Sequence, residues 1–401
     1  MATYLFLESE RRRLMHRPRM ARSLAMFTIL VLTLTAGVLG QTGALQAPPE
    51  LSSIAYAVYD GDYGYLILEK NGYQRRSIAS ITKVMTLLVI VELVEEDKLP
   101  LDGEVTASAR AASREGTQIK LKAGDQFTVE ELLYATALVS ANDAAVALAE
   151  YVAGSEADFT KLMNAKAQEL GLGNTHYVDC TGLLSIFSNN YSTAYDQARL
   201  LKVALEHELF ADILSTPSYF LEPQGRKITN SHPLLDLAGV EGGKTGATTP
   251  AGHTLITSCV RHERRLILVV LGARSREVRN DENKRLLEWA FGNLRTLISS
   301  EEVLTRVVVQ DGVDHQVNAV LATEFSLVAQ DEGDLEYQTD IQILPKLKAP
   351  IDRGDKVGEV VITRGGEDFT RLDLVAQQST GLATWLRRIF NGLGRIFGGG
   401  D

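Results

Sequence analysis

The sequence predicts an α+β fold, in which an antiparallel sheet flanked by helices is followed by a small all-β domain. Strand-like runs stand early, at residues 53–59 and 65–69, and late, at residues 254–260 and 265–271. Helical stretches separate these two groups, and this order favours one sheet in which the early and late strands pair. From residue 303 to residue 375, short alternating runs are separated by turn residues, which is typical of a β domain.

Four stretches have the pattern of helices, and three of them lie between the early and the late strands. Residues 81–94 are strongly apolar and long enough for a buried helix, and residues 129–152 are rich in Ala and Leu. Residues 193–205 and 282–291 indicate two further helices. Most of the helical content therefore lies between the early and the late strands.

Composition places the chain among ordinary globular proteins. It has 401 residues, 45% of them hydrophobic and 23% charged, which suggests more than one domain. The formal net charge is -10, and the body of the chain has no long basic block. We therefore expect no nucleic-acid partner, because phosphate backbones bind clustered Lys and Arg.

The N-terminus has the order of a secretory signal. Six arginines precede an uncharged apolar run over residues 23–40, and the small residues Thr42, Gly43 and Ala44 follow. We interpret residues 1–44 as a signal peptide and the protein as exported. An uncleaved membrane anchor is the alternative, because the apolar run is close to the length that spans a bilayer.

The C-terminus predicts a basic amphipathic helix over residues 379–401. Apolar residues recur there at spacings of three and four, and arginines lie largely on the other flanks. The apolar set is Leu382, Trp385, Leu386, Ile389, Phe390, Leu393, Ile396 and Phe397. We expect this helix to lie on a membrane surface; packing on the protein itself or on a partner is the alternative. Residues 50–298 and 299–378 are the two domains expected before it.

Cysteine and histidine usage predicts no metal site. Cys180 and Cys259 are far apart and are expected to be buried free thiols, although export would permit a disulfide. No His-x-x-x-His or Cys-x-x-Cys pair occurs. We expect no metal and no cofactor.

The stretch Ser80-Ile81-Thr82-Lys83 carries the first chemical signal. A serine hydroxyl needs a base, and positions i and i+3 of a helix share a face. Lys83 can act as that base only when it is neutral part of the time, which burial and a nearby positive charge such as Lys244 would favour. A capping serine beside a solvated lysine is the alternative, since this short motif also arises by chance.

Two further short motifs are weak when each is taken alone. Ser140-Ala141-Asn142 offers a hydroxyl and a carboxamide for proton transfer and for binding an amide, although a turn is the simpler interpretation. Lys244-Thr245-Gly246 follows two glycines and suits a strand edge that pairs with a peptide. It is not a phosphate loop, because no Gly stands at the first position of that pattern.

Together and in this order, the three motifs resemble the active-site set of penicillin-binding proteins and serine β-lactamases. The surrounding sequence is similar to the low-molecular-mass D-alanyl-D-alanine carboxypeptidases in particular. The matching stretches, which extend over nearly the whole chain, are residues 79–86, 140–145, 174–177, 180–183, 192–196, 242–246, 252–291, 349–351 and 354–358. The resemblance implies a β-lactamase/transpeptidase-like catalytic domain, a β-sandwich domain and a membrane-anchoring terminal helix.

The resemblance also implies a reaction. Ser80 is expected to be acylated by a peptidoglycan stem pentapeptide ending in D-Ala-D-Ala, after which the terminal D-Ala leaves and water hydrolyses the acyl-enzyme. Lys83 is the implied base, and Ser140 delivers a proton to the leaving amine. Penicillin and other β-lactam antibiotics would acylate the same serine. The implied location is the extracytoplasmic face of the cytoplasmic membrane.

The remaining implied site residues bind the substrate. The resemblance assigns the substrate amide to Asn142 and the terminal carboxylate to Lys244, Thr245 and Arg279. Gly246 continues the binding strand, and the backbone N–H groups of Ser80 and Ala247 would form the oxyanion hole.

The sequence departs from the family pattern at two positions. Ala247 stands where relatives often carry a larger residue such as His or Tyr, so a backbone role survives there and a side-chain role does not. His232 stands in place of the second Asn of a motif that some relatives carry before Lys-Thr-Gly.

Three other functions compete with the carboxypeptidase prediction. A class A β-lactamase uses a glutamate after Ser-x-Asn, and no Glu occurs from residue 170 to residue 205. A peptidoglycan endopeptidase would carry the same motifs. A non-catalytic peptidoglycan-binding protein is disfavoured, because a binding module need not keep a nucleophile and its base.

Overall fold

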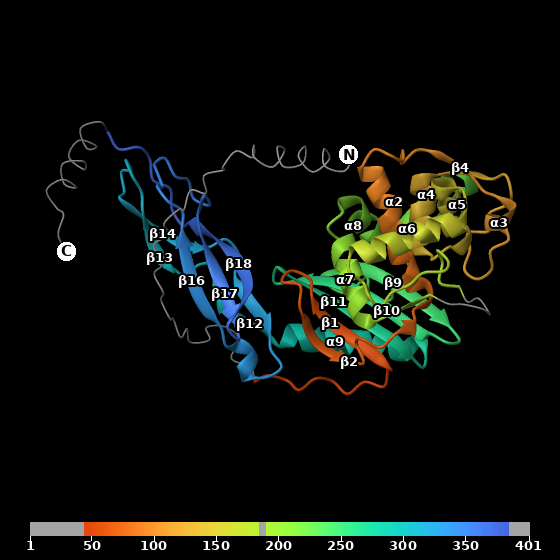
Figure 1. Cartoon of the computed structure of the whole chain (residues 1–401), viewed down its shortest axis with the longest axis horizontal. Helices are drawn as coiled ribbons and strands as arrows, with labels where there is room; N and C mark the ends of the chain where they lie inside the picture. Colours follow the sequence, from red (N-terminus) through yellow and green to blue (C-terminus); the bar gives the residue numbers. More distant parts are fainter. Residues whose placement is uncertain (1–43, 184–189, 385–401) are drawn as a thin grey trace, which may run out of the picture. The chain divides into compact units, whose positions relative to one another are not determined.

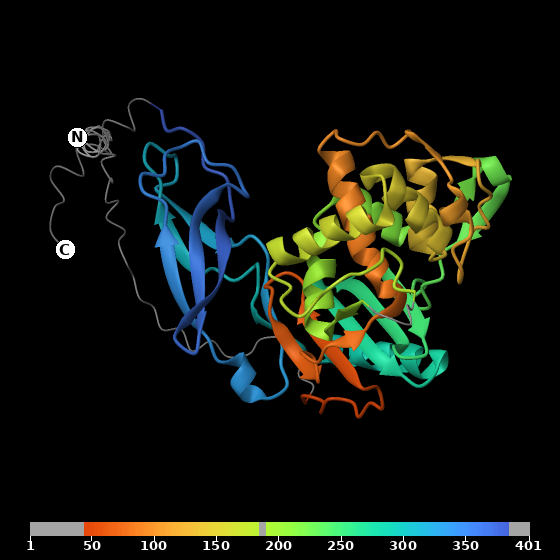
Figure 2. The ribbon, with the colours of Figure 1, turned by 45° about the vertical axis from the view of Figure 1, so that its right-hand side comes forward.

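A computed structural model describes residues 44–183 and 190–384 of the chain (Figures 1 and 2). The described chain divides into two compact units, one of residues 44–296 and 326–335 and one of residues 297–325 and 336–384. Neither unit is a single uninterrupted stretch, because residues 326–335 return to the first unit. The predicted boundaries at residues 50, 298 and 378 stay predictions.

The first unit is built on a five-stranded sheet in the order β2-β1-β11-β10-β9. All of its neighbouring strands are antiparallel. The early strand β1 pairs with the late strand β11, from Ala55 opposite Leu271 to Asp60 opposite Leu266, which confirms the predicted pairing. The strands are β1 (Ala55–Asp60), β2 (Leu66–Lys70), β9 (Val240–Thr248), β10 (Gly252–Arg261) and β11 (Arg264–Ala273).

Eight α-helices are described in this unit, and they cover both faces of the sheet (Figure 1). Helix α9 packs against β10 and β11 on one face, and α7 packs against β1 and β11 on the other. The helices are α2 (Lys83–Glu95), α3 (Ala109–Ala112), α4 (Val129–Leu138), α5 (Asn142–Ala153), α6 (Glu156–Glu169), α7 (Ala194–Ala204), α8 (Glu208–Ser215) and α9 (Arg276–Gly292).

Strand β11 explains why both faces need cover. Successive side chains of a strand point to opposite faces, so a strand buried on both sides is apolar throughout. The residues in the core beneath α2 and α7 are Ile267, Val269 and Leu271; those in the core beneath α9 are Leu266, Leu268 and Val270.

Helix α2 lies among other helices rather than at the surface. Its residues from Lys83 to Val91 are all buried, and it contacts α4, α5, α6, α7 and α8. A helix that is apolar on every side is expected in such a position. The predicted buried helix is therefore confirmed, and it begins directly after the 3₁₀ turn η1 (Ala79–Thr82).

Two predicted helices differ in extent from those in the structure. The stretch 129–152 forms two helices, α4 and α5, because Ser140 has a φ of 63° and the chain turns there. Helix α9 starts six residues before the predicted residue 282, since the side chain of Ser275 caps it by accepting a hydrogen bond from the Val278 N–H. The first turns of α9 are charged, so the periodicity of apolar residues could not locate the start of the helix.

The described residues also form several shorter strands and 3₁₀ turns. Four two-stranded sheets are formed by β3 with β6, β4 with β5, β7 with β8, and β12 with β15. Their bounds are β3 (Arg76–Ser77), β4 (Glu104–Thr106), β5 (Gln126–Thr128), β6 (Tyr191–Ser192), β7 (Ser218–Leu221), β8 (Arg226–Thr229), β12 (Leu294–Ile298) and β15 (Phe325–Val328). Two more 3₁₀ turns are η2 (Glu222–Gln224) and η3 (Glu332–Leu335).

The second unit contains a five-stranded antiparallel sheet in the order β13-β14-β18-β17-β16. In β14, Val317, Ala319 and Leu321 are buried at alternate positions, the spacing expected of a strand that covers a core. The predicted all-β domain is confirmed. Its strands are β13 (Thr305–Val308), β14 (Gln316–Leu321), β16 (Gln338–Ile343), β17 (Lys356–Arg364) and β18 (Glu367–Ala376).

The predicted terminal segments fall mainly outside the described residues. Of the signal peptide predicted at residues 1–44, only Ala44 is described, and residues 385–401 of the predicted terminal helix are not. The described start of that helix is not helical, because Thr380 and Leu382 form β-bridges with Ile351 and Gly312. Within residues 44–183 and 190–384, no helix is long and apolar enough to cross a membrane.

The two cysteines are free, as predicted. Cys180 and Cys259 are both completely buried. Burial raises the pKa of each thiol, so both are uncharged at neutral pH.

Candidate active site

Ser80 lies in η1, which leads directly into α2. The turn is fastened to the sheet by Thr254, whose hydroxyl donates a 3.2 Å hydrogen bond to the carbonyl of Ile78. Ala79 has a φ of 50°, a conformation that costs a residue with a Cβ about 1 kcal/mol or more. Because the residues on both sides of Ser80 are buried, the turn holds a single hydroxyl at the surface of the helical layer.

The amine of Lys83 is buried and has three polar neighbours. It lies 3.1 Å from Ser80 Oγ, 2.6 Å from Asn142 Oδ1 and 2.8 Å from the carbonyl of Thr181. A neutral amine has two N–H donors and one lone pair. The two fixed acceptors can take both donors, which leaves the lone pair for the Ser80 hydroxyl.

The protonation of Lys83 follows from this environment. Burial is the main cause that lowers its pKa, to about 8, and the positive charge of Arg114 lowers it further. The carboxylates of Asp179 and Asp143 oppose the shift. Lys244, the neighbour named from the sequence, also interacts with Lys83, since the charge of Lys83 lowers the pKa of Lys244. Arg114 is a second cation near Lys83, and the motifs did not indicate it.

The loop of residues 178–182 is bound along one side of α2. Thr86 donates a 2.7 Å hydrogen bond to the carbonyl of Cys180. Asn190 links the loop to Thr82, because it accepts a 2.7 Å hydrogen bond from the Val178 N–H and donates one of 2.9 Å to the Thr82 hydroxyl. Lys83, whose amine donates to the carbonyl of Thr181, lies between Thr82 and Thr86 in the sequence. This loop thus forms one wall around the amine.

Ser140 lies in the break between α4 and α5, and Asn142 is the first residue of α5. Ser140 lines the cleft beside Ser80, and its buried hydroxyl has no hydrogen-bond partner among the described residues. Asn142 uses both ends of its amide internally, accepting from Lys83 and donating a 2.7 Å bond to the carbonyl of Glu115. The predicted contact of Asn142 with substrate would therefore compete with the bonds that hold Lys83 and the Glu115 carbonyl.

Strand β9 carries the Lys-Thr-Gly motif past the serine. Gly246 stands opposite Thr254 of β10, and Ala247 stands opposite His253. Lys244 is buried, and its amine has one long contact, 3.4 Å to the carbonyl of Thr245. Burial, followed by the charges of Lys83 and Arg279, lowers the pKa of Lys244 well below its usual value.

Two glycines of β9 are required by close approach. A Cβ on Gly246 would lie 2.9 Å from the backbone nitrogen of Ser80 and 3.0 Å from the Ala79 Cβ. Gly243 has a φ of 153°, and a Cβ there would lie 1.9 Å from the carbonyl oxygen of Ile256. Gly246 therefore lets β9 pass close to the serine turn, and Gly243 lets β9 lie close to the backbone of β10.

Arg279 enters the site from the first turn of α9. It is 5% exposed, and its guanidinium donates two hydrogen bonds to Asn280 Oδ1, at 2.9 and 2.8 Å. Burial and the neighbouring Arg276 lower its pKa to about 10, so it stays charged at neutral pH. No carboxylate pairs with Arg279 or Lys244 among the described residues, which leaves the charged guanidinium of Arg279 and the amine of Lys244 open to an anion.

A cleft of about 420 Å³ brings these residues together. Six of the nine predicted site residues line it, and Lys83, Asn142 and Lys244 lie buried behind them. The lining residues are Ser80, Thr117, Val139, Ser140, Ser231, Pro233, Thr245, Gly246, Ala247, His253, Arg276, Arg279 and Asn280.

His232 lies in the interior behind β9. Its Nε2 is 3.1 Å from the hydroxyl of Thr257, and its Nδ1 accepts a hydrogen bond from the Leu234 N–H at 3.4 Å. Burial lowers the pKa of this imidazole to about 3, so it is neutral. His232 is not among the residues that line the cleft, so it is not placed to contact a ligand there.

The structure adds residues that the motifs did not indicate. His253, Arg276 and Asn280 line the cleft, and Arg114 and Asp179 lie close to the lysine. No short motif joins these residues to Ser80 in the sequence, because it is the folding of the sheet and the loops that brings them together. The nearby signals were two stretches that are similar to the family sequence: 252–291, which contains His253, Arg276 and Asn280, and 180–183, which directly follows Asp179.

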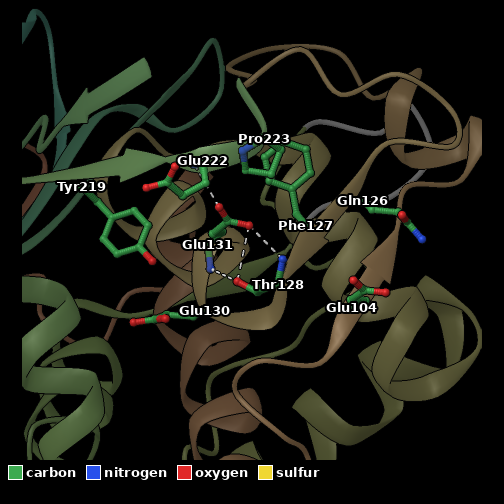
Figure 3. Close-up of a pocket in the computed structure, with 9 residues that line it drawn as sticks. All are labelled: Glu104, Gln126, Phe127, Thr128, Glu130, Glu131, Tyr219, Glu222 and Pro223. Atoms are coloured by element: carbon green, nitrogen blue, oxygen red, sulfur yellow. Dashed lines mark hydrogen bonds between the residues drawn. The ribbon is translucent and has the colours of Figure 1, made fainter. Parts of the chain in front are cut away.

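A second hollow of about 380 Å³ lies beside β5 and α4 (Figure 3). Four glutamates line it, but the buried one, Glu131, is used by the fold. Glu131 closes the capping box of α4 with Thr128 and accepts a 3.1 Å hydrogen bond from the Glu222 N–H. No group of acidic, cysteine or histidine residues suited to a metal ion is present in the described part of the chain.

Comparison with known proteins agrees with this geometry. A family model described as D-alanyl-D-alanine carboxypeptidase matches residues 42–275, and one described as penicillin-binding protein 5, C-terminal domain, matches residues 293–381. D-alanyl-D-alanine carboxypeptidase DacF of Bacillus subtilis (strain 168) is 34% identical over 337 residues, which are 82% of this chain and 86% of that protein.

Solved structures give the same result. Penicillin-binding protein 5 of Haemophilus influenzae superposes with a TM-score of 0.63 at 28% identity, over 84% of this chain and 99% of that one. Penicillin-binding protein D2 of Listeria monocytogenes, solved in an ampicillin-bound form, has a TM-score of 0.56 at 30% identity, over 60% of this chain and 98% of that one.

The fold, with a serine and a lysine at the start of a buried helix and Lys-Thr-Gly on the facing strand, defines a serine acyl-transfer enzyme of the penicillin-binding class. The chain belongs to the D-alanyl-D-alanine carboxypeptidase family.

Proposed function

We propose that this enzyme removes the terminal D-Ala from peptidoglycan stem pentapeptides through an acyl-enzyme on Ser80. The observation that carries the proposal is the buried amine of Lys83, 3.1 Å from Ser80 Oγ, beside a cleft that the charged Arg279 lines and behind which the amine of Lys244 lies without a carboxylate partner. A nucleophile with its base beside a site for a carboxylate fits a peptide that ends in a free carboxyl group.

Acylation begins with Lys83 in its neutral form. Its amine takes the proton of the Ser80 hydroxyl as the oxygen attacks the carbonyl carbon of the penultimate D-Ala. The C–N bond to the terminal D-Ala then breaks, and the leaving nitrogen takes a proton. Ser140 is suited to relay that proton from Lys83 to the nitrogen, because its hydroxyl lines the cleft and has no bond to a described residue. The proton that Lys83 took from Ser80 thus replaces the one that Ser140 gives up, and Lys83 is neutral again. Water then hydrolyses the ester and frees Ser80.

The developing oxyanion is stabilised by backbone N–H groups in this proposal. The amide of Ser80 lies where β9 passes closest, as the 2.9 Å distance to a Cβ on Gly246 indicates. The amide of Ala247 is next along that strand, so these two donors can flank one carbonyl oxygen. This role needs no side chain at position 247.

The terminal carboxylate binds between Lys244, Thr245 and Arg279. An anion there would favour the charged form of Lys244, whose pKa is low while its surroundings are buried and positively charged. The same set would hold the carboxylate of a β-lactam, which acylates Ser80 by opening its ring. A β-lactam leaving group stays attached, so its acyl-enzyme is expected to last longer.

We further propose that the protein is exported and anchored to the extracytoplasmic face of the cytoplasmic membrane. The apolar residues and arginines of residues 385–401 support a terminal amphipathic anchor, and residues 1–44 support a secretory signal.

Incubation with diacetyl-Lys-D-Ala-D-Ala tests the carboxypeptidase assignment. Release of free D-Ala by the wild-type chain and its absence with Ser80→Ala is the expected result. Cleavage of a crosslinked muropeptide without D-Ala release would favour an endopeptidase. No turnover of either substrate would favour a binding protein.

A further inference from the structure

Arg114 lies between two carboxylates close to the base. Its Nη2 is 2.8 Å from Glu156 Oε1 and 3.6 Å from Asp179 Oδ1, and it donates a 3.4 Å hydrogen bond to the hydroxyl of Thr181. The side chains of Glu156 and Asp179 are 4% and 12% exposed. Because solvent screens buried charges less than surface charges, these groups act over a longer distance than they would at the surface.

Asp179 shapes the backbone that faces Lys83. Its Oδ1 accepts hydrogen bonds of 2.7 Å from the Thr181 N–H, the Thr181 hydroxyl and the Gly182 N–H. These bonds fold the chain so that the carbonyl of Thr181 accepts from the Lys83 amine at 2.8 Å. Gly182 completes the turn with a φ of 76°, and a Cβ there would lie 1.9 Å from the Ala79 carbonyl oxygen.

A continuous set of contacts therefore joins Arg114 to the catalytic amine. It runs from the guanidinium to Asp179, through the turn to the Thr181 carbonyl, and from there to Lys83. We propose that Arg114 and Asp179 are positioning residues for the reaction, which act on Lys83 through this carbonyl and through their opposite charges. The inference rests on the proposed role of Lys83 as the base.

The two residues have opposite electrostatic effects on the lysine. Arg114 lowers the pKa of Lys83, and Asp179 raises it, while burial is the largest cause of its low value. The thiol of Cys180 also faces the amine, but its pKa is raised well above the usual value by burial, so it carries no charge at neutral pH. The charged or titratable groups around the amine are Arg114, Asp143, Asp179, Cys180 and Lys244.

The test measures kcat/KM for D-Ala release against pH in three variants of the full-length chain. Arg114→Gln removes the cation, so the acid limb of the profile should move up by about 0.5 to 1 pH unit. Asp179→Asn keeps an oxygen acceptor for the turn and removes the charge, so the limb should move down by a similar amount. Arg114→Lys should return the limb toward the wild-type position.

Arg110→Gln is the matched control. Arg110 makes a 2.6 Å ion pair with the same carboxylate, Glu156, but its side chain is 61% exposed and it is not among the main causes acting on Lys83. This variant should leave the acid limb in place. A shift equal to that of Arg114→Gln would mean that loss of the Glu156 pair, and not the charge near Lys83, moved the profile.

The outcomes separate this inference from the proposed function. Opposite shifts of the acid limb for Arg114→Gln and Asp179→Asn support the inference. The pH profile of the rate of acylation by a fluorescent penicillin should shift in the same direction as the kcat/KM profile in each variant. Unchanged limbs, or shifts in one direction for both variants, overturn it while wild-type turnover stays intact. Failure of the wild-type chain to release D-Ala would instead overturn the proposed function.

Discussion

The side-chain amine of Lys83 lies 3.1 Å from the hydroxyl oxygen of Ser80, and its other two polar contacts are acceptors held by the fold. This geometry determines the direction of proton transfer, which is from the Ser80 hydroxyl to the Lys83 amine. Because the carbonyl of Thr181 and the amide oxygen of Asn142 can only accept, a neutral amine turns its lone pair to the serine.

The pH dependence of acylation follows from Lys83. In the proposed mechanism its neutral form is the base, and its pKa is about 8, so kcat/KM should fall about tenfold for each pH unit below that value. Asn142→Asp would place a carboxylate beside the amine, raise the pKa of Lys83 and move the acid limb to higher pH. Stopped-flow acylation by a fluorescent penicillin measures this.

Asn174→Asp is the control for that change, since Asn174 bonds to the exposed side chain of Arg75, away from the amine. It should leave the limb unchanged. An acid limb that stays in place in Asn142→Asp would show that a group other than Lys83 titrates in the profile.

Gly246→Ala should disrupt catalysis more than folding. The added Cβ would meet the Thr254 hydroxyl at 2.6 Å and the Ser80 nitrogen at 2.9 Å, so the serine turn must shift. A shift of this size can lower kcat by about 10²-fold, and overpacking costs about 1–3 kcal/mol of stability. Steady-state kinetics and urea unfolding measure the two effects.

Gly173→Ala is its matched control, because a Cβ on Gly173 meets no atom within 4 Å. This variant should retain wild-type kcat. Equal losses in the two variants would contradict the close approach of β9 to Ser80.

Arg279→Gln should weaken recognition of the free carboxylate. Removing a charge-assisted hydrogen bond costs about 1.5–3 kcal/mol, so kcat/KM for the acid substrate should fall about 10- to 100-fold. The same substrate with a C-terminal amide should be affected much less. Arg285→Gln, on the same helix and bonded to the carbonyl of Glu50, should change neither substrate. An equal loss on acid and amide would mean that Arg279 acts through the fold.

Removal of residues 385–401 tests the membrane anchor. The truncation leaves Thr380 and Leu382 in place, since both pair with the β domain through bridges. The truncated protein should be found in the soluble fraction with its penicillin labelling intact. Retention on membranes would assign the anchoring to another segment.

The sequence predicted the parts of the site that local patterns encode. Apolar runs identified β10, β11 and α2, and three short motifs predicted Ser80, Ser140 and Lys244, which the structure brings to one cleft or directly behind it. It could not predict the break at Ser140, because a single residue with positive φ leaves the Ala- and Leu-rich composition unchanged. It missed Arg114, whose role depends on a loop that meets Asp179 only in the folded chain.

Mass spectrometry of the penicillin-treated chain tests the central claim most directly. One β-lactam adduct should form, and peptide mapping should find it on Ser80. Ser80→Ala should carry no adduct, whereas Ser113→Ala, at an exposed serine, should label like the wild-type chain. An adduct on any other residue, or one that persists in Ser80→Ala, would contradict the account.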